Sequence, residues 1–444
     1  MEKRYTLPVA IALVVGTVIG SGVFFKAEAV LTKTGGNLTV GILAFIIMGV
    51  VMIISACTFG AVAQSHEGVE GLVGYAAASC GKTYGYYVGW FMAVIYYPSL
   101  VSVLSWLPAR YFGVLMGWED AVVGGRTMML AGVFMVVTYT MNALAPKLAG
   151  KFAIATTIIK LIPLLLMAVV GTIVGLANGM TEFNFSNVVT EMPFTEGLFG
   201  AIVSLAFAFE GWICATSIGA ELKDSKKNMP RALLIGTLIV AIVYVIYYVG
   251  LAGAVESEVM MAGGEAGAKI AFQNIFGQVG GAAIFVFVVI SCWGTCNGLT
   301  MAVTRGMFDL ATESDSPKLK LFKNVDPTTN MANNSAVFGL LVSSLWLLYF
   351  YGGAIMEGFG PFKFDSSELP IITLYAIYIP IYIALLKRKD LGGFQGRVMP
   401  VLAILCSVFM VFAAIYSHKW NALYYLIVFF VIEVIGACFR GKRA

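Results

Sequence analysis

Long runs of apolar residues, separated by short polar connections, dominate this chain. A helix needs about 20 mostly apolar residues to cross the hydrocarbon core of a membrane. About twelve runs reach that length, and each of them predicts a membrane-spanning helix. The predicted spans are residues 7–32, 38–64, 85–112, 127–144, 147–176, 197–221, 231–254, 279–311, 334–353, 367–387, 397–417 and 421–439. We therefore expect an all-α polytopic membrane protein.

The composition supports this interpretation. Hydrophobic residues make up 59% of the chain and charged residues 12%, with a mean hydropathy of +0.89. These values exclude an ordinary soluble domain. No Pro- or Ser-rich linker divides the chain, so we expect one membrane domain over residues 1–444. The first run contains several glycines and no A-x-A-like cleavage site, which favours a retained helix over a removable signal peptide.

The positions of the basic residues predict the orientation of the spans. Of the 28 Lys and Arg residues, about 20 fall on the side of the amino terminus and about 7 on the opposite side, with Lys160 inside a span. Cytoplasmic loops of membrane proteins carry an excess of Lys and Arg. We therefore expect both termini in the cytoplasm and the protein in the plasma membrane.

Cysteine and histidine are too few and too scattered to indicate a metal site. The seven cysteines lack paired metal-ligand spacing, and only two histidines accompany them. We expect no metal, no cofactor and no disulfide framework. Enzymatic activity is not expected either, because the sequence offers no metal set and no plausible acid–base pair.

Two glycine-containing clusters interrupt otherwise long spans. The first is G-T-V-I-G-S-G-V-F at residues 16–24, and the second is F-A-F-E-G-W at residues 207–212, five spans later. Broken helices are tolerated in membranes only where the backbone is buried in protein or lines a cavity. Such breaks therefore indicate a binding site, although small residues also allow helices simply to pack closely.

Unwinding at the first cluster would expose backbone groups of both polarities. The amides of Ser21, Gly22 and Val23 would begin a half-helix, where free donors and the positive end of the helix dipole favour a carboxylate. The carbonyls of Ile19, Phe207 and Ala208 would be acceptors for an ammonium group. Together these groups suit a zwitterionic ligand.

Lys160 lies within an apolar stretch, residues 153–170, whose other polar members are Thr156 and Thr157. A lysine at the centre of a membrane helix costs about 2.5–3.5 kcal/mol on insertion scales, so it is expected to face the protein interior or a wet cavity. The alternative is a lysine that extends to the interface or lines an inert polar pocket. Its position in the middle of the span favours the first interpretation.

These motifs, together with K-L-I-P at residues 160–163 and the segment from Glu221 through N-M-P-R-A at residues 228–232, resemble an amino acid permease of the amino acid–polyamine–organocation (APC) superfamily. Within it, the chain is most similar to bacterial members of the L-type amino acid transporter group. The resemblance implies the LeuT-type fold with broken helices 1 and 6. Residues 7–176 would form the first five-helix repeat, 197–387 the inverted second repeat, and 397–439 two added helices.

The resemblance also implies roles for individual residues. The substrate carboxylate is expected at Ser21 and Gly22, its amino group near Ile19 and residues 207–210, and an aromatic gate at Phe207. The expected substrate-binding set is Ile19, Gly20, Ser21, Gly22, Val23, Phe207, Ala208, Phe209, Glu210 and Gly211. Lys160 matches a lysine that replaces the coupling sodium ion of related transporters, with Ser291 and Thr295 on helix 8 as its expected partners.

Glu210 is the least ordinary member of this set, and three roles remain open for it. It could contact the side chain of a cationic substrate, pair with Lys160 or a proton, or sit hydrated at the edge of the cavity. The function implied is a sodium-independent, alternating-access exchanger for neutral and possibly cationic amino acids. The alternative is a proton-coupled amino acid or polyamine uptake permease.

The resemblance bears on partners as well. The L-type chains of eukaryotes use a cysteine in the loop between helices 3 and 4 to bond an ancillary glycoprotein, whereas residues 113–126 contain no cysteine. We therefore expect a transporter that works without a disulfide-linked partner, with amino acids as substrates, the lipid bilayer around it and no nucleic acid.

Overall fold

The computed structural model describes residues 5–66, 69, 71–388, 391 and 393–441. Within these residues, twelve helical segments are long and apolar enough to cross a membrane, which confirms the predicted number. An even number of crossings returns the chain to its starting side. The start of the first span and the end of the last span therefore lie on the same face of the membrane.

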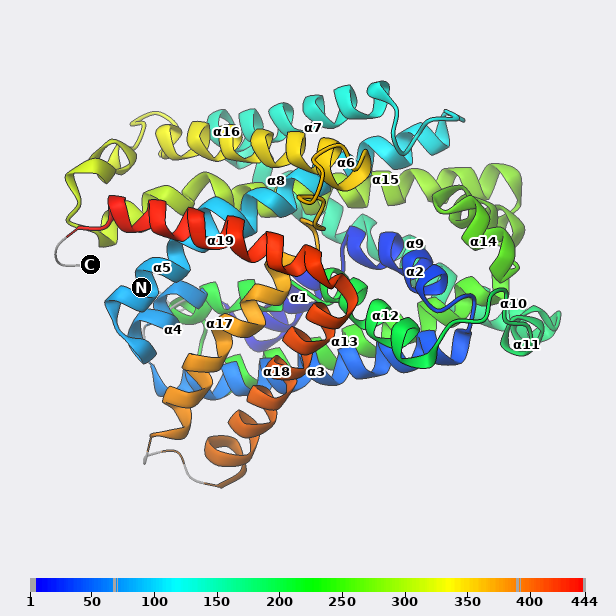
Figure 1. Ribbon diagram of the computed structural model, residues 1–444, viewed down its shortest axis with the longest axis horizontal. Helices are drawn as coiled ribbons and strands as arrows, with labels where there is room; N and C mark the ends of the chain where they lie inside the picture. Colours follow the sequence, from blue (N-terminus) through cyan, green and yellow to red (C-terminus); the bar gives the residue numbers. More distant parts are fainter. Residues whose placement is uncertain (1–4, 67–68, 70, 389–390, 392, 442–444) are drawn as a thin grey trace.

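The spans, in chain order, are α1 with α2 (Leu7–Val18, Ser21–Lys33), α3 (Leu38–Ser65), α5 with η1 and α6 (Lys82–Phe91, Met92–Tyr96, Tyr97–Leu115), α7 (Gly125–Leu144), α8 with α9, η2 and α10 (Pro146–Ile159, Leu161–Leu166, Met167–Gly171, Thr172–Ala177), α12 with η3 (Phe194–Ala208, Trp212–Glu221), α13 (Ser225–Ala254), α15 (Glu265–Glu313), α16 with η5 (Asn333–Tyr349, Phe350–Ile355), α17 (Leu369–Leu386), η6 with α18 (Phe394–Val398, Met399–His418) and α19 (Trp420–Phe439). Shorter helices in the connections are α4 (Gly71–Cys80), α11 (Met180–Ser186), α14 (Ser257–Gly263) and η4 (Pro317–Lys323). Long helices such as α7, α15, α16 and α19 run roughly along the long axis of the molecule, whereas α17 and α18 are inclined to it (Figure 1).

A helical segment precedes the eighth span. The apolar pattern placed the start of this span at residue 279, and the structure has a non-helical break at Gly277, where φ is 74°, with a further helical segment from Glu265 before it. Glycine adopts this left-handed conformation without steric cost. The connection before the span is therefore a short helix joined to it by one non-helical residue, which an apolar count does not detect.

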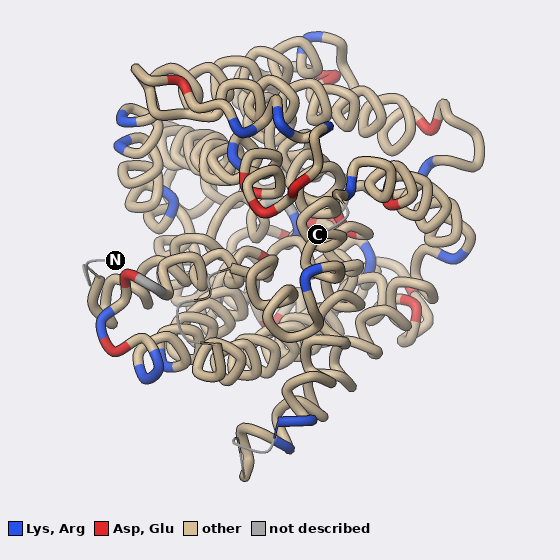
Figure 2. The backbone as a smooth tube through the Cα atoms, turned by 90° about the vertical axis from the view of Figure 1, so that its left-hand side faces the viewer, with Lys and Arg blue, Asp and Glu red and all other residues tan. Residues whose placement is uncertain are grey.

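The helices are arranged so that the two interrupted spans lie inside the bundle. About 78% of the most apolar window of the sixth span and 50% of that of the first are buried, compared with 17% of that of the twelfth. Charged residues are few along most of the chain (Figure 2). α12 packs against α2 and α3, and α1 packs against α13 and η3. The helix breaks therefore occupy the protein interior, where irregular backbone is tolerated in a membrane.

Candidate functional site

The first span is broken where the sequence predicted. α1 ends at Val18 and α2 begins at Ser21, which leaves Ile19 and Gly20 in extended conformations between them. A β-carbon at Gly20 would lie 2.7 Å from the Oγ1 atom of Thr295 on α15. A side chain at this position would therefore push α15 away from the break.

The sixth span is broken as well. α12 ends at Ala208, and Phe209, Glu210 and Gly211 separate it from the tighter helix η3. Gly211 has φ 104°, a conformation that only glycine adopts readily. A β-carbon there would lie 2.7 Å from the carbonyl oxygen of Thr17, so this break packs directly on the last turn of α1.

The two breaks contact each other. A β-carbon on Gly22 would lie 2.7 Å from Cα of Ala208 and 3.3 Å from the carbonyl oxygen of Phe207. The first turn of α2 therefore lies against the last turn of α12. Both predicted polarities meet here, because the amino end of one half-helix adjoins the carbonyl end of another.

The predicted donors lie in the first turn of α2. Ser21 and Val23 are fully buried, and Gly22 lies between them. Amides in the first turn of a helix have no acceptor within the helix. In this conformation the Ser21 amide donates to Thr295 Oγ1 over 3.3 Å. Thr295 Oγ1 thus accepts the hydrogen bond of an amide that was predicted to bind the substrate carboxylate.

Tyr244 on α13 supports the same break and was not identified from the sequence. Its hydroxyl donates to the carbonyl oxygen of Val18 over 3.0 Å, and its ring centroid lies 5.1 Å from that of Phe209. A tyrosine in an apolar span carries no signal of its own at the sequence level. Its role follows only from the position of the last carbonyl of α1.

Lys160 lies between α8 and α9 and is 6% exposed. Its ammonium group donates a hydrogen bond to the carbonyl oxygen of Gly16, in the last turn of α1. The expected contact with the first span is therefore present. Among the described residues Lys160 makes no hydrogen bond to Ser291 or Thr295, which were its expected partners. Thr295 Oγ1 instead donates to the Ser291 carbonyl oxygen over 3.0 Å and accepts from the Ser21 amide. α8 and α15 thus hold opposite sides of the same break.

Glu210 is 8% exposed and accepts a hydrogen bond of 2.9 Å from the hydroxyl of Tyr96. Its carboxylate and the Lys160 ammonium group have different hydrogen-bonding partners in the described part of the chain. Tyr96, in the π-helical turn η1, was not identified from the sequence. Such turns are frequent at functional sites, but hydrophobic spacing does not reveal them.

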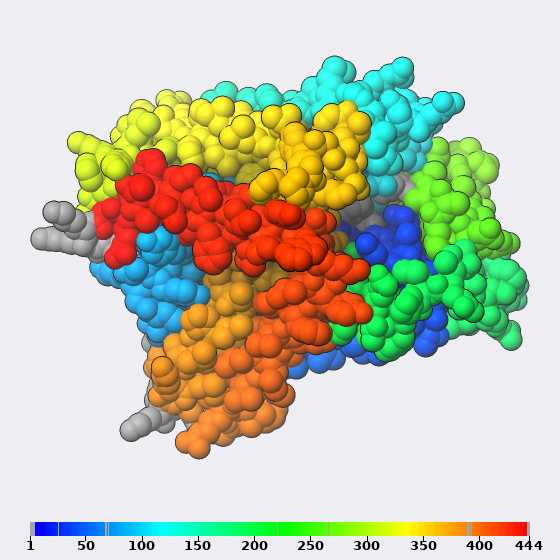
Figure 3. All heavy atoms as spheres, viewed as in Figure 1, coloured from blue at the N-terminus to red at the C-terminus, as the bar shows by residue number. Residues whose placement is uncertain are grey.

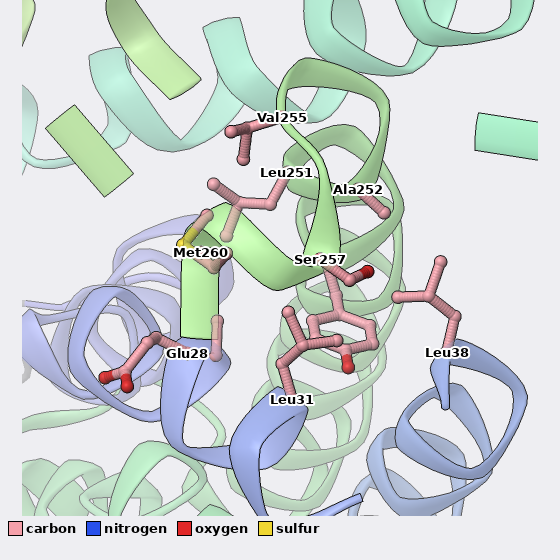
Figure 4. Close-up of a pocket in the computed structure, with 10 residues that line it drawn as sticks. Glu28, Leu31, Leu38, Leu251, Ala252, Val255, Ser257 and Met260 are labelled. Atoms are coloured by element: carbon pink, nitrogen blue, oxygen red, sulfur yellow. The ribbon is translucent and has the colours of Figure 1, made fainter. Parts of the chain in front are cut away.

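A separate small apolar pocket lies between α2, α13 and α14, next to the start of α3 (Figure 4). Its lining includes Leu31, Leu251 and Met260, and the carboxylate of Glu28 points away from these side chains. Of the expected substrate-binding residues, none lines this cavity. We therefore locate the candidate site at the breaks and not here.

Twelve spans, two of them interrupted at contacting backbone breaks, define a polytopic membrane protein of the transporter class with the LeuT-type fold. Residues 6–437 match the family model described as amino acid permease, so the chain belongs to that family.

Two relatives show how far the similarity extends. The serine/threonine exchanger SteT of Bacillus subtilis is 28% identical over 422 residues, which is 92% of this chain and 90% of the relative. The b(0,+)-type amino acid transporter 1 of Mus musculus is 24% identical over 436 residues, 96% of this chain and 85% of the relative. The similarity thus spans nearly all of each chain.

Proposed function

We propose that this protein is a sodium-independent amino acid exchanger that works by alternating access. The observation that carries the proposal is the contact between the two helix breaks, where Gly22 meets Phe207 and Ala208. Substrate bound there would touch the amino end of α2 and the carbonyl end of α12 together. The names of the relatives, which include a serine/threonine exchanger, support an amino acid as the substrate.

In this proposal the backbone supplies recognition of the amino acid itself. The amides of Ser21, Gly22 and Val23 bind the carboxylate, and the Ser21 amide exchanges Thr295 Oγ1 for substrate. The carbonyls of Ile19 and of residues 207–208 bind the α-amino group. The two helices stay unwound at Gly20, Phe209 and Gly211, which leaves their backbone groups free for the substrate. The Phe207 ring covers the substrate.

In this proposal the ammonium group of Lys160 provides the coupling in place of a sodium ion. Its bond to Gly16 ties α8 to α1, so a substrate anion arriving at the start of α2 changes the electrostatic environment of the same span. Both termini would lie in the cytoplasm of a bacterial cell, with α2 pointing outward. The protein would act without a disulfide-linked partner and without enzymatic activity.

A second function, proton-coupled uptake of amino acids or polyamines, is favoured by one observation. Glu210 places a carboxylate inside the break of the sixth span, and Tyr96 holds it there. A buried carboxylate is a possible proton carrier. The same acid could instead bind the side chain of a cationic substrate.

Counterflow in sodium-free proteoliposomes distinguishes these functions. Liposomes preloaded with radiolabelled serine are placed in buffer containing one neutral, cationic or acidic amino acid. Efflux that requires an external amino acid supports exchange and names the substrate class. Efflux of equal rate into empty buffer would contradict obligatory exchange, and acidification of the lumen with uptake would favour the proton-coupled function.

A further inference from the structure

A buried group of polar side chains joins four helices on the α2 side of the two breaks. Lys26 of α2 is 3% exposed, and its ammonium group donates to Oε1 of Glu368 over 2.7 Å. Glu368 immediately precedes α17 and is 6% exposed. Ser204 of α12 donates to the same oxygen over 2.9 Å, and Nε2 of His418, at the end of α18, lies 3.2 Å from the other carboxylate oxygen. We call Lys26, Ser204, Glu368 and His418 the Glu368 cluster.

The carboxylate at the centre of this cluster is held in place by its own turn. Oδ1 of Asp365 accepts hydrogen bonds from the amides of Ser367 and Glu368, over 2.6 and 3.0 Å. The Ser367 hydroxyl also donates to Asp365 and lies 3.4 Å from the Lys26 ammonium group. These bonds fix the start of α17, so α2 and α12 meet a preorganised acceptor.

The cluster is directly connected to the candidate site. Lys26 follows Ser21 and Gly22 on the same helix and lies 5.6 Å from the centroid of the Phe207 ring. Ser204 lies one turn before Phe207 on α12. In Figure 3 the dark blue atoms of the first span appear beside the orange-red atoms near the turn between α18 and α19. Lys26 and Ser204 thus both link Glu368 to the surroundings of the Phe207 ring.

The environment of the ion pair makes it suited to two alternative arrangements. A buried ion pair repays the cost of desolvation only with good geometry and further hydrogen bonds, and a separated pair in a dry interior leaves two uncompensated charges. Separation of Lys26 from Glu368 is therefore expected only when water enters between α2 and α17. The closed, dry pair and the open, hydrated pair are distinct states.

We propose that Lys26 and Glu368 form an ionic latch that holds α2 and α12 against α17 and thereby positions Phe207 over the substrate. The inference rests on the proposed transport function, and with cytoplasmic termini the latch closes the outer entrance. Ser204 and His418 orient the carboxylate. Lys26 and Glu368 are positioning residues, because they act on the substrate through Phe207 and the start of α2.

The latch predicts opposite effects on the two sides of the membrane. Apparent affinity on one side falls as the fraction of protein competent to bind there falls. Glu368→Gln and Lys26→Gln should favour the outward-open state. The concentration of external amino acid that half-saturates exchange should then fall, and that of internal amino acid should rise. The ratio of these two half-saturating concentrations should change by at least about tenfold.

The experiment measures exchange in oriented, sodium-free proteoliposomes while external and internal amino acid are varied separately. The charge-swapped variant Lys26→Glu/Glu368→Lys should move the ratio back toward the wild-type value. Glu357→Gln is the matched control, because its ion pair with Lys363 is solvent-exposed and of similar length, 2.6 Å compared with 2.7 Å. Equal changes on both sides, or no change in Glu368→Gln, would overturn the latch.

A second measurement does not depend on transport. Hydrogen–deuterium exchange of peptides that cover residues 21–33 and 365–372 should become faster in Glu368→Gln and stay unchanged in Glu357→Gln. If Glu368→Gln does not fold, the charge-retaining variants Glu368→Asp and Lys26→Arg should show smaller shifts in the same direction, and unchanged protection in them would refute the latch. Wild-type liposomes without exchange would refute the proposed function and leave this second measurement decisive for the latch.

Discussion

Two buried lysines, Lys160 and Lys26, lie on opposite sides of the break in the first span, and their partners differ. Lys160 donates to the neutral carbonyl of Gly16, whereas Lys26 pairs with the carboxylate of Glu368. A carbonyl satisfies an ammonium proton but leaves the positive charge in place, and a carboxylate cancels that charge. Lys160 can therefore respond to an arriving anion, while Lys26 is suited to holding two helices together.

The strongest test of this difference removes Lys160. Lys160→Ala loses a hydrogen bond from a charged group, which is worth about 1.5–3 kcal/mol, or about 10- to 150-fold in rate. We expect exchange to fall by at least that factor while the yield of folded protein changes little. Uptake per folded molecule, normalised by size-exclusion chromatography, checks this.

Lys160→Arg is the control, because it retains the charge with a different shape. Some recovery of exchange in this variant would support an electrostatic role. If Lys160→Ala transports like the wild-type protein, Lys160 has no part in coupling, and the comparison between the two lysines has no functional content.

Glu210 sharpens the comparison, because it is a buried acid whose carboxylate accepts a hydrogen bond from Tyr96. If the acid contacts a cationic side chain, Glu210→Gln should weaken lysine and arginine transport about tenfold relative to serine, in line with the loss of one charged hydrogen bond. Competition of each amino acid against radiolabelled serine measures the ratio.

Tyr96→Phe is the matched variant, since it removes the donor and keeps the carboxylate. Uniform losses for neutral and cationic substrates in Glu210→Gln would point instead to a structural or proton-carrying role. A change in the pH dependence of uptake would distinguish those two roles.

The smallest effect is expected at a third lysine. Lys363 and Glu357 form an ion pair whose side chains are 42% and 63% exposed. Exposed pairs contribute about 0–1 kcal/mol to stability. Lys363→Gln should therefore leave exchange unchanged and shift the free energy of unfolding within that range, as thermal unfolding in detergent would show. A large loss of transport would mean that charge near this loop matters in itself.

The spans and the two breaks could be predicted from the sequence because both depend on local patterns. Apolar runs give the spans, and the glycines at positions 20, 22 and 211 mark backbone that a side chain would obstruct. The helical segment that precedes the eighth span was not predicted, because a kink at Gly277 separates it from the apolar run.

The Glu368 cluster could not be predicted, because its members are brought together only by tertiary packing. Lys26 and Glu368 are 342 residues apart in the chain, and each lies near the end of a span, where a charged residue looks like an ordinary boundary. The same holds for Tyr96 and Tyr244, whose hydroxyls have partners fixed by the position of the breaks. Pairing between distant helices leaves no trace in the order of residues.

The mutual fit of the breaks has a practical consequence for following the transport cycle. Gly22 leaves no room against Ala208, and Gly211 leaves none against Thr17, so neither interrupted span can turn far without carrying the other. The two interrupted spans should therefore move together as one rigid unit. A single fluorophore pair, one dye on the α2 side and one on a static helix such as α7, would then report the motion of both spans in real time.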